Sequence, residues 1–323
     1  MDIPLIDIAG FSSTDPEARA RVVGQWRDAL DQLGFLTISG HGISDRLMSE
    51  VHAAGSVFFE LPLERNLAWV AKDFSDGPTG YVRLFGEAVG KTHGGVAAPD
   101  VSESLTFVSP AAGAVPAAGP VTHQNLWPDE PAGFRALIGD YAAQAYELGL
   151  RLMGISALAL DLPEDYFAPF YAPMVHKLRL AYYPEQAVEP GPGQLRNAAH
   201  TDFAGFTILR QDDAPGGLQV QAPSGAWIDV PSRPGTLVIN TGDLIQRWTN
   251  DRWLSNVHRV VNPPRAHDGP TRRLSLVFFT GPGLDSQITC LPTCQTPERP
   301  AIYEPIIASE HLSRKLAQTY EAG

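Results

Sequence analysis

The second half of the chain contains short apolar stretches that recur at close intervals. Clusters of Gly, Pro, Asn and Asp separate these stretches, which cover residues 177–183, 204–210, 217–221, 226–230, 236–240, 257–261 and 273–280. Short apolar runs that alternate with turn-forming residues are typical of antiparallel β-sandwiches and barrels. From about residue 176 onward we therefore predict a β-rich core.

Helical patterns precede and follow this core. A helix is expected after Asp15–Pro16, a long amphipathic helix between Pro131 and Pro163, and a last helix from Ser309. We divide the chain into an N-terminal mixed α/β region (1–120), a long scaffold helix (121–174), the core (175–285) and a C-terminal segment with a helix (286–323). These parts are expected to form one compact unit of the α+β class.

Composition limits the partners and the location of such a protein. The 323 residues carry a net charge of −12, which argues against nucleic acid as the main partner because Lys and Arg drive that binding. Cys290 and Cys294 are the only cysteines, which is no disulfide framework and fits a reducing cytoplasm. There is no signal-peptide pattern and no apolar run long enough to span a membrane. We expect a cytoplasmic monomer that acts on a small molecule.

Two histidines and one carboxylate have the spacing of a metal site. His200 and Asp202 stand two residues apart, so on a strand both side chains point to the same face. His258 lies 56 residues after Asp202, within another expected strand. Two His and one carboxylate form the facial triad of non-haem Fe(II), which leaves coordination positions open for a chelating co-substrate and O2.

Two further stretches place polar groups on one side of a strand. Arg273 and Ser275 share a face, and a guanidinium fork beside a hydroxyl is suited to a carboxylate. Arg179 and Tyr183 alternate with leucines in the same way. Both strands can therefore direct polar side chains into the interior of the core.

Taken together, these motifs resemble the isopenicillin N synthase-like branch of the Fe(II)/2-oxoglutarate-dependent dioxygenases. The matching stretches are IPLIDIAGF, GFLTISGHGI, HTDFAGFTILRQDD, GGLQVQ, WIDVPSRPGTLVINTGDLIQRWTNDRW, SNVHRVVNPP and RRLSLVFF. The resemblance implies a double-stranded β-helix (jelly roll) core flanked by helices. It also implies Fe(II) bound by His200, Asp202 and His258, and 2-oxoglutarate held by Arg273 and Ser275, with Tyr183 and then Arg179 as further candidates.

The implied activity is oxidation of a small molecule at an unactivated C–H bond, with consumption of O2 and 2-oxoglutarate and release of succinate and CO2. Hydroxylation is the expected outcome. The substrate pocket in this family implies contacts from Arg83, Phe85, Phe107, Phe203, Phe206 and Phe279, with Arg83 as a partner for a substrate carboxylate. The excess of Arg over Lys, 20 against 4, indicates a GC-rich bacterial genome, and we expect a role in specialised metabolism.

Two other functions are compatible with the sequence. The fold also hosts oxidases that bind no 2-oxoglutarate and use the Arg-x-Ser pair for the substrate, and stoichiometric succinate release separates these from the dioxygenases. A non-catalytic jelly-roll binder would also keep the shape of the core, but the intact triad argues against it.

Overall fold

Two facing sheets form the centre of the molecule, which we describe from a computed structural model covering residues 2–70, 79–93, 98–109, 125–186 and 189–320. The main sheet has the strand order β1-β2-β10-β7-β12-β5-β4-β3, and the smaller sheet the order β6-β11-β8-β9. The main-sheet strands are β1 (Leu5–Asp7), β2 (Phe35–Ser39), β3 (Gly80–Val82), β4 (Glu103–Val108), β5 (Val175–Tyr183), β7 (Phe206–Arg210), β10 (Leu237–Thr241) and β12 (Arg273–Gly281). The smaller sheet comprises β6 (Asn197–His200), β8 (Gly217–Gln221), β9 (Trp227–Asp229) and β11 (His258–Val261). This is the jelly-roll core that the resemblance implied.

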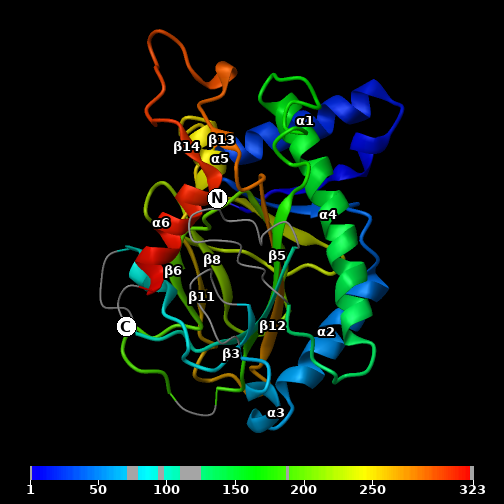
Figure 1. The fold of residues 1–323 in the computed structure, drawn as a ribbon, viewed down its shortest axis with the longest axis vertical. Helices are drawn as coiled ribbons and strands as arrows, with labels where there is room; N and C mark the ends of the chain where they lie inside the picture. Colours follow the sequence, from blue (N-terminus) through cyan, green and yellow to red (C-terminus); the bar gives the residue numbers. More distant parts are fainter. Residues whose placement is uncertain (1, 71–78, 94–97, 110–124, 187–188, 321–323) are drawn as a thin grey trace.

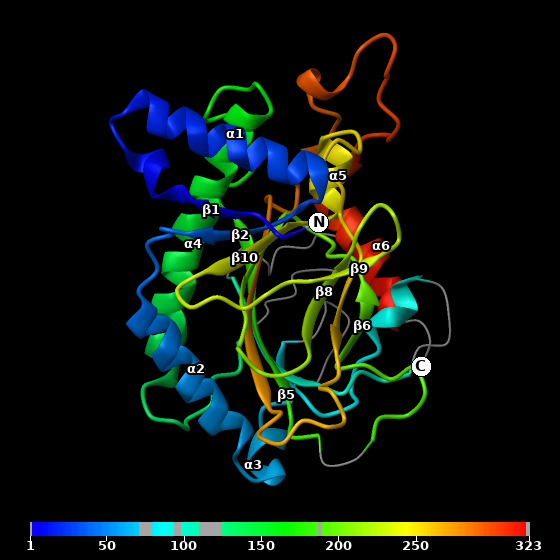
Figure 2. The same ribbon diagram turned by 180° about the vertical axis from the view of Figure 1, so that it is seen from behind.

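Helices cover the outer face of the main sheet. Figures 1 and 2 show α2 (Asp45–Phe59) and α4 (Phe134–Ala159) on that side, with α1 (Pro16–Gln32) across one end and α3 (Leu63–Leu67) after α2. The smaller sheet lies on the opposite side, next to α6 (Ala308–Tyr320). The remaining elements are α5 (Asp243–Trp248), the short 3-10 helices η1 (Ile8–Ser12), η2 (Val89–His93) and η5 (Pro292–Cys294), and a two-stranded antiparallel sheet of β13 (Gln287–Ile288) and β14 (Ile306–Ile307).

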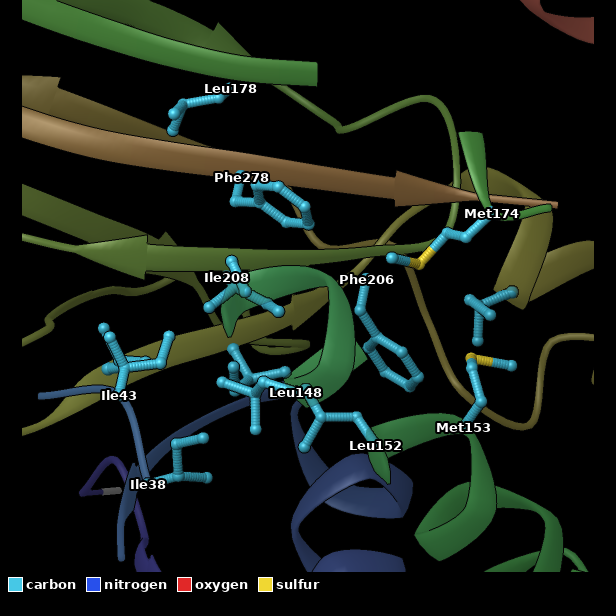
Figure 3. Packing of buried hydrophobic residues seen from close by; sticks show 14 of the residues in the cluster. Ile38, Ile43, Leu148, Leu152, Met153, Met174, Leu178, Phe206, Ile208 and Phe278 are labelled. Carbon is cyan, nitrogen blue, oxygen red and sulfur yellow. The ribbon is translucent and has the colours of Figure 1, made fainter. Parts of the chain in front are cut away.

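The long helix α4 is buried because its apolar side chains repeat at helical spacing. Leu148 and Leu152 pack toward Phe206, Ile208 and Phe278 of the main sheet, as Figure 3 shows. A fully buried leucine contributes roughly 1.5–3 kcal/mol, so this face holds the helix layer on the sheet. The helix is the one expected between Pro131 and Pro163.

Capping residues that are recognisable in the sequence stand at both ends of α1. The Asp15 carboxylate accepts a hydrogen bond from the Glu17 amide at 2.9 Å, and Pro16 opens the first turn. Gly34 ends the helical region with φ of +66°, and a Cβ there would lie 2.3 Å from the Leu254 carbonyl oxygen. Glycine is therefore required where the chain turns from α1 into β2.

Strand alternation separates the two faces of β5 and β12. Their leucines and Phe278 pack on the helix layer, whereas Arg273 and Ser275 of β12 face the smaller sheet together with Tyr183 of β5. Among the helices of the described ranges, none is both long and apolar enough to cross a membrane.

Candidate active site

The three metal-ligand candidates meet between the two sheets. His200 ends β6 and is paired in register with His258, the first residue of β11, and Asp202 follows in the loop after β6. The Nε2 atoms of His200 and His258 each lie 3.8 Å from Oδ1 of Asp202. One ligand atom from each of the three residues lies within 4.8 Å of the other two, and all three side chains are buried. The sequence predicts Asp202 on a strand with His200, but it lies in the loop, which turns its carboxylate to the same place.

Backbone carbonyls orient both imidazole rings. Nδ1 of His200 lies 2.8 Å from the Ala198 carbonyl oxygen, and Nδ1 of His258 lies 3.1 Å from that of Asn256. A carbonyl oxygen only accepts, so each Nδ1 carries the hydrogen and each Nε2 presents a lone pair toward Asp202. This is the tautomer and orientation that metal-binding histidines adopt.

Among the described residues, the side-chain hydrogen bonds to the Asp202 carboxylate all reach one of its oxygens. Oδ2 accepts a hydrogen bond from Thr207 Oγ1 at 2.5 Å and from Asn240 Nδ2 at 2.7 Å. These contacts leave Oδ1 directed toward the two imidazoles. Sequence reasoning did not identify Thr207 or Asn240, which come from β7 and β10 and lie far from each other in the sequence.

The electrostatics of the cluster favour the protonation state that binds metal. Burial lowers the pKa of His200, and the nearby His258 lowers it further. Burial alone would raise the pKa of Asp202, but the two imidazoles and the two hydrogen bonds bring it below its ordinary value. Neutral imidazoles and an ionised carboxylate are the ligand forms that divalent iron requires, so the residues present fit Fe(II).

Arg273 lies buried at the start of β12, directly opposite Tyr183 in register, with 3% of its surface exposed. Its Nη2 donates to Gln211 Oε1 at 2.9 Å and its Nη1 to the Ala214 carbonyl at 3.2 Å. Its Nε is buried with no hydrogen-bond partner among the described residues. Ser275, two residues along, points to the same face. The guanidinium is thus fixed in place while some of its donors remain available for an anion.

Two arginines, Arg196 and Arg179, lie near Tyr183. Burial raises the pKa of its hydroxyl, and the guanidinium of Arg196 lies over its ring at 5.9 Å. Arg179, four residues earlier on β5, pairs through both of its terminal nitrogens with Glu87. The Glu87 carboxylate already accepts hydrogen bonds from both terminal nitrogens of Arg179. Arg179 is therefore better suited to an ion pair that supports the site than to binding a co-substrate.

The structure brings some of the expected substrate residues to the site and not others. Phe279 lies on the interior face of β12, and Phe203 directly follows Asp202, where its carbonyl accepts a hydrogen bond from His311 of α6 at 3.1 Å. Arg83 and Phe85 are exposed in the turn after β3. Within the described ranges, neither of them forms a hydrogen bond, an ion pair or a ring contact with the triad.

Phe107 and Phe206 lie on the opposite face of the main sheet. Phe206 meets Trp26 of α1 edge-on at 5.8 Å, and Phe107 stacks on Trp127 at 4.5 Å. Both are part of the core beneath the helices. We therefore remove them from the substrate candidates, because alternation on β7 turns Thr207, not Phe206, toward Asp202.

Family comparisons agree with this geometry. The 2OG-Fe(II) oxygenase superfamily matches residues 174–282, and the family described as non-haem dioxygenase in morphine synthesis, N-terminal, matches residues 3–130. The two matches together take in both the N-terminal strands of the main sheet and the whole triad.

Curated relatives and solved structures match nearly the whole chain. The 2-oxoglutarate-Fe(II) type oxidoreductase hxnY of Emericella nidulans is 33% identical over 98% of this chain and 90% of its own. A homoarginine-6-hydroxylase of Oryza sativa subsp. japonica is also 33% identical, over 98% of this chain and 97% of its own. A full-length Neurospora crassa protein crystallised with alpha-KG and thymine superposes with a TM-score of 0.86 at 31% identity, covering 98% of this chain and 97% of that one. The chain therefore belongs to the 2OG-Fe(II) oxygenase superfamily and is an Fe(II)- and 2-oxoglutarate-dependent oxygenase.

Proposed function

We propose that this enzyme hydroxylates a small molecule at an unactivated C–H bond, with His200, Asp202 and His258 as the Fe(II) ligands. The observation that carries the proposal is the set of three donor atoms, two Nε2 and one Oδ1, that face one another within 4.8 Å. When bound, Fe(II) supplies the oxidising chemistry, in which O2 and 2-oxoglutarate are consumed and succinate and CO2 are released.

In this proposal Arg273 and Ser275 hold the distal carboxylate of 2-oxoglutarate, with Tyr183 beside them. A guanidinium has five N–H donors, and two of those of Arg273 are used by Gln211 and Ala214. The others can form the paired hydrogen bonds that a carboxylate accepts. Burial of the site strengthens such a pair, because water does not compete for it.

The size of the substrate is inferred from the relatives. One is named as a homoarginine-6-hydroxylase and another as a proline hydroxylase, and the Neurospora crassa protein was crystallised with thymine. These names support a small polar organic molecule as the substrate of this chain. A role in bacterial specialised metabolism, a cytoplasmic location and a monomeric state stay predictions, and these relatives are fungal or plant proteins.

An anaerobic titration tests the assignment of the cofactor residues. Fe(II) is added to the metal-free protein, then 2-oxoglutarate, and the visible spectrum is recorded. We expect a weak charge-transfer band that needs both additions. The variants H200A, D202A and H258A should lose the band and bind Fe(II) more weakly.

The outcomes separate the functions that the sequence left open. Tight iron binding without a band would instead support an oxidase that uses no 2-oxoglutarate. No iron binding would overturn the ligand assignment. With the band present, succinate release is then measured against candidate substrates, and product mass shows whether one oxygen atom has been added.

A further inference from the structure

Lys177 lies on the interior face of β5, in register with Thr207, the residue that donates a hydrogen bond to Asp202. Across the main sheet it is paired with Phe279 of β12, and Phe279 is paired with Thr207 of β7. Thr207 is the residue that donates to Asp202. Neighbouring strands are about 4.8 Å apart, so the Cα atoms of Lys177 and Thr207 are about 10 Å apart. β5 and β12 run side by side in Figure 1.

No hydrogen bond or ion pair links the Lys177 ammonium to any residue in the part of the chain that the structure describes. Burial and the adjacent charge of Arg179 together lower its pKa to about 8, although Glu87 acts in the opposite direction. Arg179 itself is matched by Glu87. A half-buried lysine without a direct hydrogen bond or ion pair is unfavourable, because its ammonium has lost hydration and the charge of Glu87 compensates only in part.

The charges around Lys177 define what would complement it. Burial alone would raise the pKa of Glu87, but Arg179 holds it below its usual range, and Lys177 and His200 contribute in the same direction. Glu87 is therefore close enough for its charge to interact with Lys177 and His200, while its direct ion pair is with Arg179. Asp100, a second buried carboxylate, also interacts with Glu87 and Arg179. The ammonium of Lys177 is then the cation of this cluster to which no described carboxylate is directly paired, so a substrate carboxylate can pair with it.

This cation is not the one that serves 2-oxoglutarate. Lys177 precedes Tyr183 by six residues on β5, and Tyr183 is paired with Arg273. Six residues of a strand span about 20 Å, which is much longer than a five-carbon diacid. Lys177 and Arg273 thus occupy opposite ends of the interior face, and the Lys177 end is the one level with Thr207.

We propose that Lys177 binds the carboxylate of the primary substrate, whose apolar part packs on Phe279 and whose reacting carbon faces the triad. This inference rests on the proposed function, because it concerns the substrate of the same site. Phe279 is half-buried between Lys177 and Thr207, so a carbon skeleton can lie against its ring. The substrate is then a small carboxylic acid, and Lys177 takes the role that sequence reasoning gave to the exposed Arg83.

A matched pair of probes tests this assignment. 3-Phenylpropionate and 3-phenylpropionamide have nearly the same shape and differ in charge, and their phenyl ring suits contact with Phe279. Binding of each is measured by anaerobic calorimetry on the protein with Fe(II) and 2-oxoglutarate. We expect the acid to bind at least about tenfold more tightly than the amide, as one charge-assisted hydrogen bond implies.

Three variants distinguish a binding role from a structural one. K177Q should remove the preference for the acid, K177R should retain most of it, and R83Q should leave it unchanged. Since no described residue forms a hydrogen bond or ion pair with the Lys177 ammonium, K177Q should melt at or above the wild-type temperature. A fall in melting temperature together with unchanged preference would make Lys177 a structural residue and overturn the proposal.

Other outcomes also decide the question. Equal binding of acid and amide by the wild type, or an acid preference that survives in K177Q, refutes the role of Lys177. Loss of the preference in R83Q alone transfers the role to Arg83. Absence of the Fe(II)–2-oxoglutarate band is a separate failure, because it contradicts the proposed function while calorimetry still reports whether Lys177 selects the acid.

Discussion

The hydroxyl of Thr207 offers a test of how the protein holds its metal-binding carboxylate. Replacing Thr207 with Val keeps the shape of the side chain and removes the hydrogen bond of 2.5 Å to Oδ2 of Asp202. Thr207 is 4% exposed, so no bulk water replaces the lost donor. Only the bond from Asn240 then remains on that oxygen.

The magnitude follows from the charge of the acceptor and its burial. A hydrogen bond to a charged group contributes ~1.5–3 kcal/mol, and each 1.4 kcal/mol is a factor of ten in affinity. We therefore expect T207V to bind Fe(II) about 10- to 100-fold more weakly, in the range seen for partners of metal ligands. The loss also removes one interaction that lowers the pKa of Asp202, so the proton competes better with the metal as pH falls.

The assay is an anaerobic Fe(II) titration in competition with a chromophoric chelator, with thermal unfolding of the metal-free protein measured in parallel. T207S serves as the matched control, because it keeps the hydroxyl and should bind within a few-fold of the wild type. If T207V and the wild type bind Fe(II) equally while both fold normally, then Thr207 does not orient Asp202 and the reasoning fails.

Four further substitutions test other parts of the structure. R273M should raise the KM for 2-oxoglutarate about 10- to 100-fold, from the same ~1.5–3 kcal/mol, and an unchanged KM in a succinate assay contradicts the assignment. G55A should destabilise by ~1–3 kcal/mol in urea unfolding, because its Cβ would lie 2.8 and 2.9 Å from two buried leucine methyl groups. G24A, with nothing within 4 Å, should instead stabilise by ~0.5–1 kcal/mol, and equal effects of the two would be inconsistent with the packing. Burial alone would raise the pKa of Asp212, but His52 and a backbone amide hold it at about 2. Because the folded pKa lies below the unfolded value, this stabilisation is complete above about pH 4 and is lost as pH falls toward 2. D212N should weaken the dependence of the unfolding free energy on pH over that range. A D212N curve parallel to that of the wild type would exclude the Asp212–His52 pair as the source of the dependence.

Much of the site follows from strand periodicity, because alternate residues share a face. The pattern around Arg273 and Ser275 predicted that both point the same way, and so did the pattern from Arg179 to Tyr183. The structure has these pairs on common faces of β12 and β5. The helix after Pro131 and the jelly-roll core were likewise predictable from apolar spacing and from the resemblance.

Periodicity does not say which of the two faces is the interior one. On β7 the sequence favours the aromatic Phe206 for the substrate site, yet Thr207 faces Asp202 and Phe206 packs on the helices. Both faces of this strand are buried, so hydrophobicity alone cannot distinguish them. A known contact is needed to identify the interior face. On β7 that contact is the hydrogen bond from Thr207 to Asp202.

Contacts between distant parts of the chain were also beyond sequence reasoning. Glu87 and Arg179 are 92 residues apart, and Asn240 lies 38 residues after Asp202. Their meeting depends on the strand order β10-β7-β12-β5 and on the loop after β3. Without that order, Asn240 is indistinguishable from any polar residue at the end of a strand.

The apolar face of β12 sets the geometry of the polar one. Leu274 and Phe278 alternate with Ser275 and Phe279, and Phe278 stacks on His176 of β5 at 5.0 Å. A slip of one residue in the pairing of β12 would send every polar side chain into the helix layer, at the cost of burying it without partners. The helix layer therefore fixes the register, and the register fixes the spacing between the Arg273 end and the Phe279 end of the interior face. Substitutions on the face of β12 that packs against the helices are then expected to change the position of the substrate as well as the stability, although the substituted side chains contact neither 2-oxoglutarate nor the substrate.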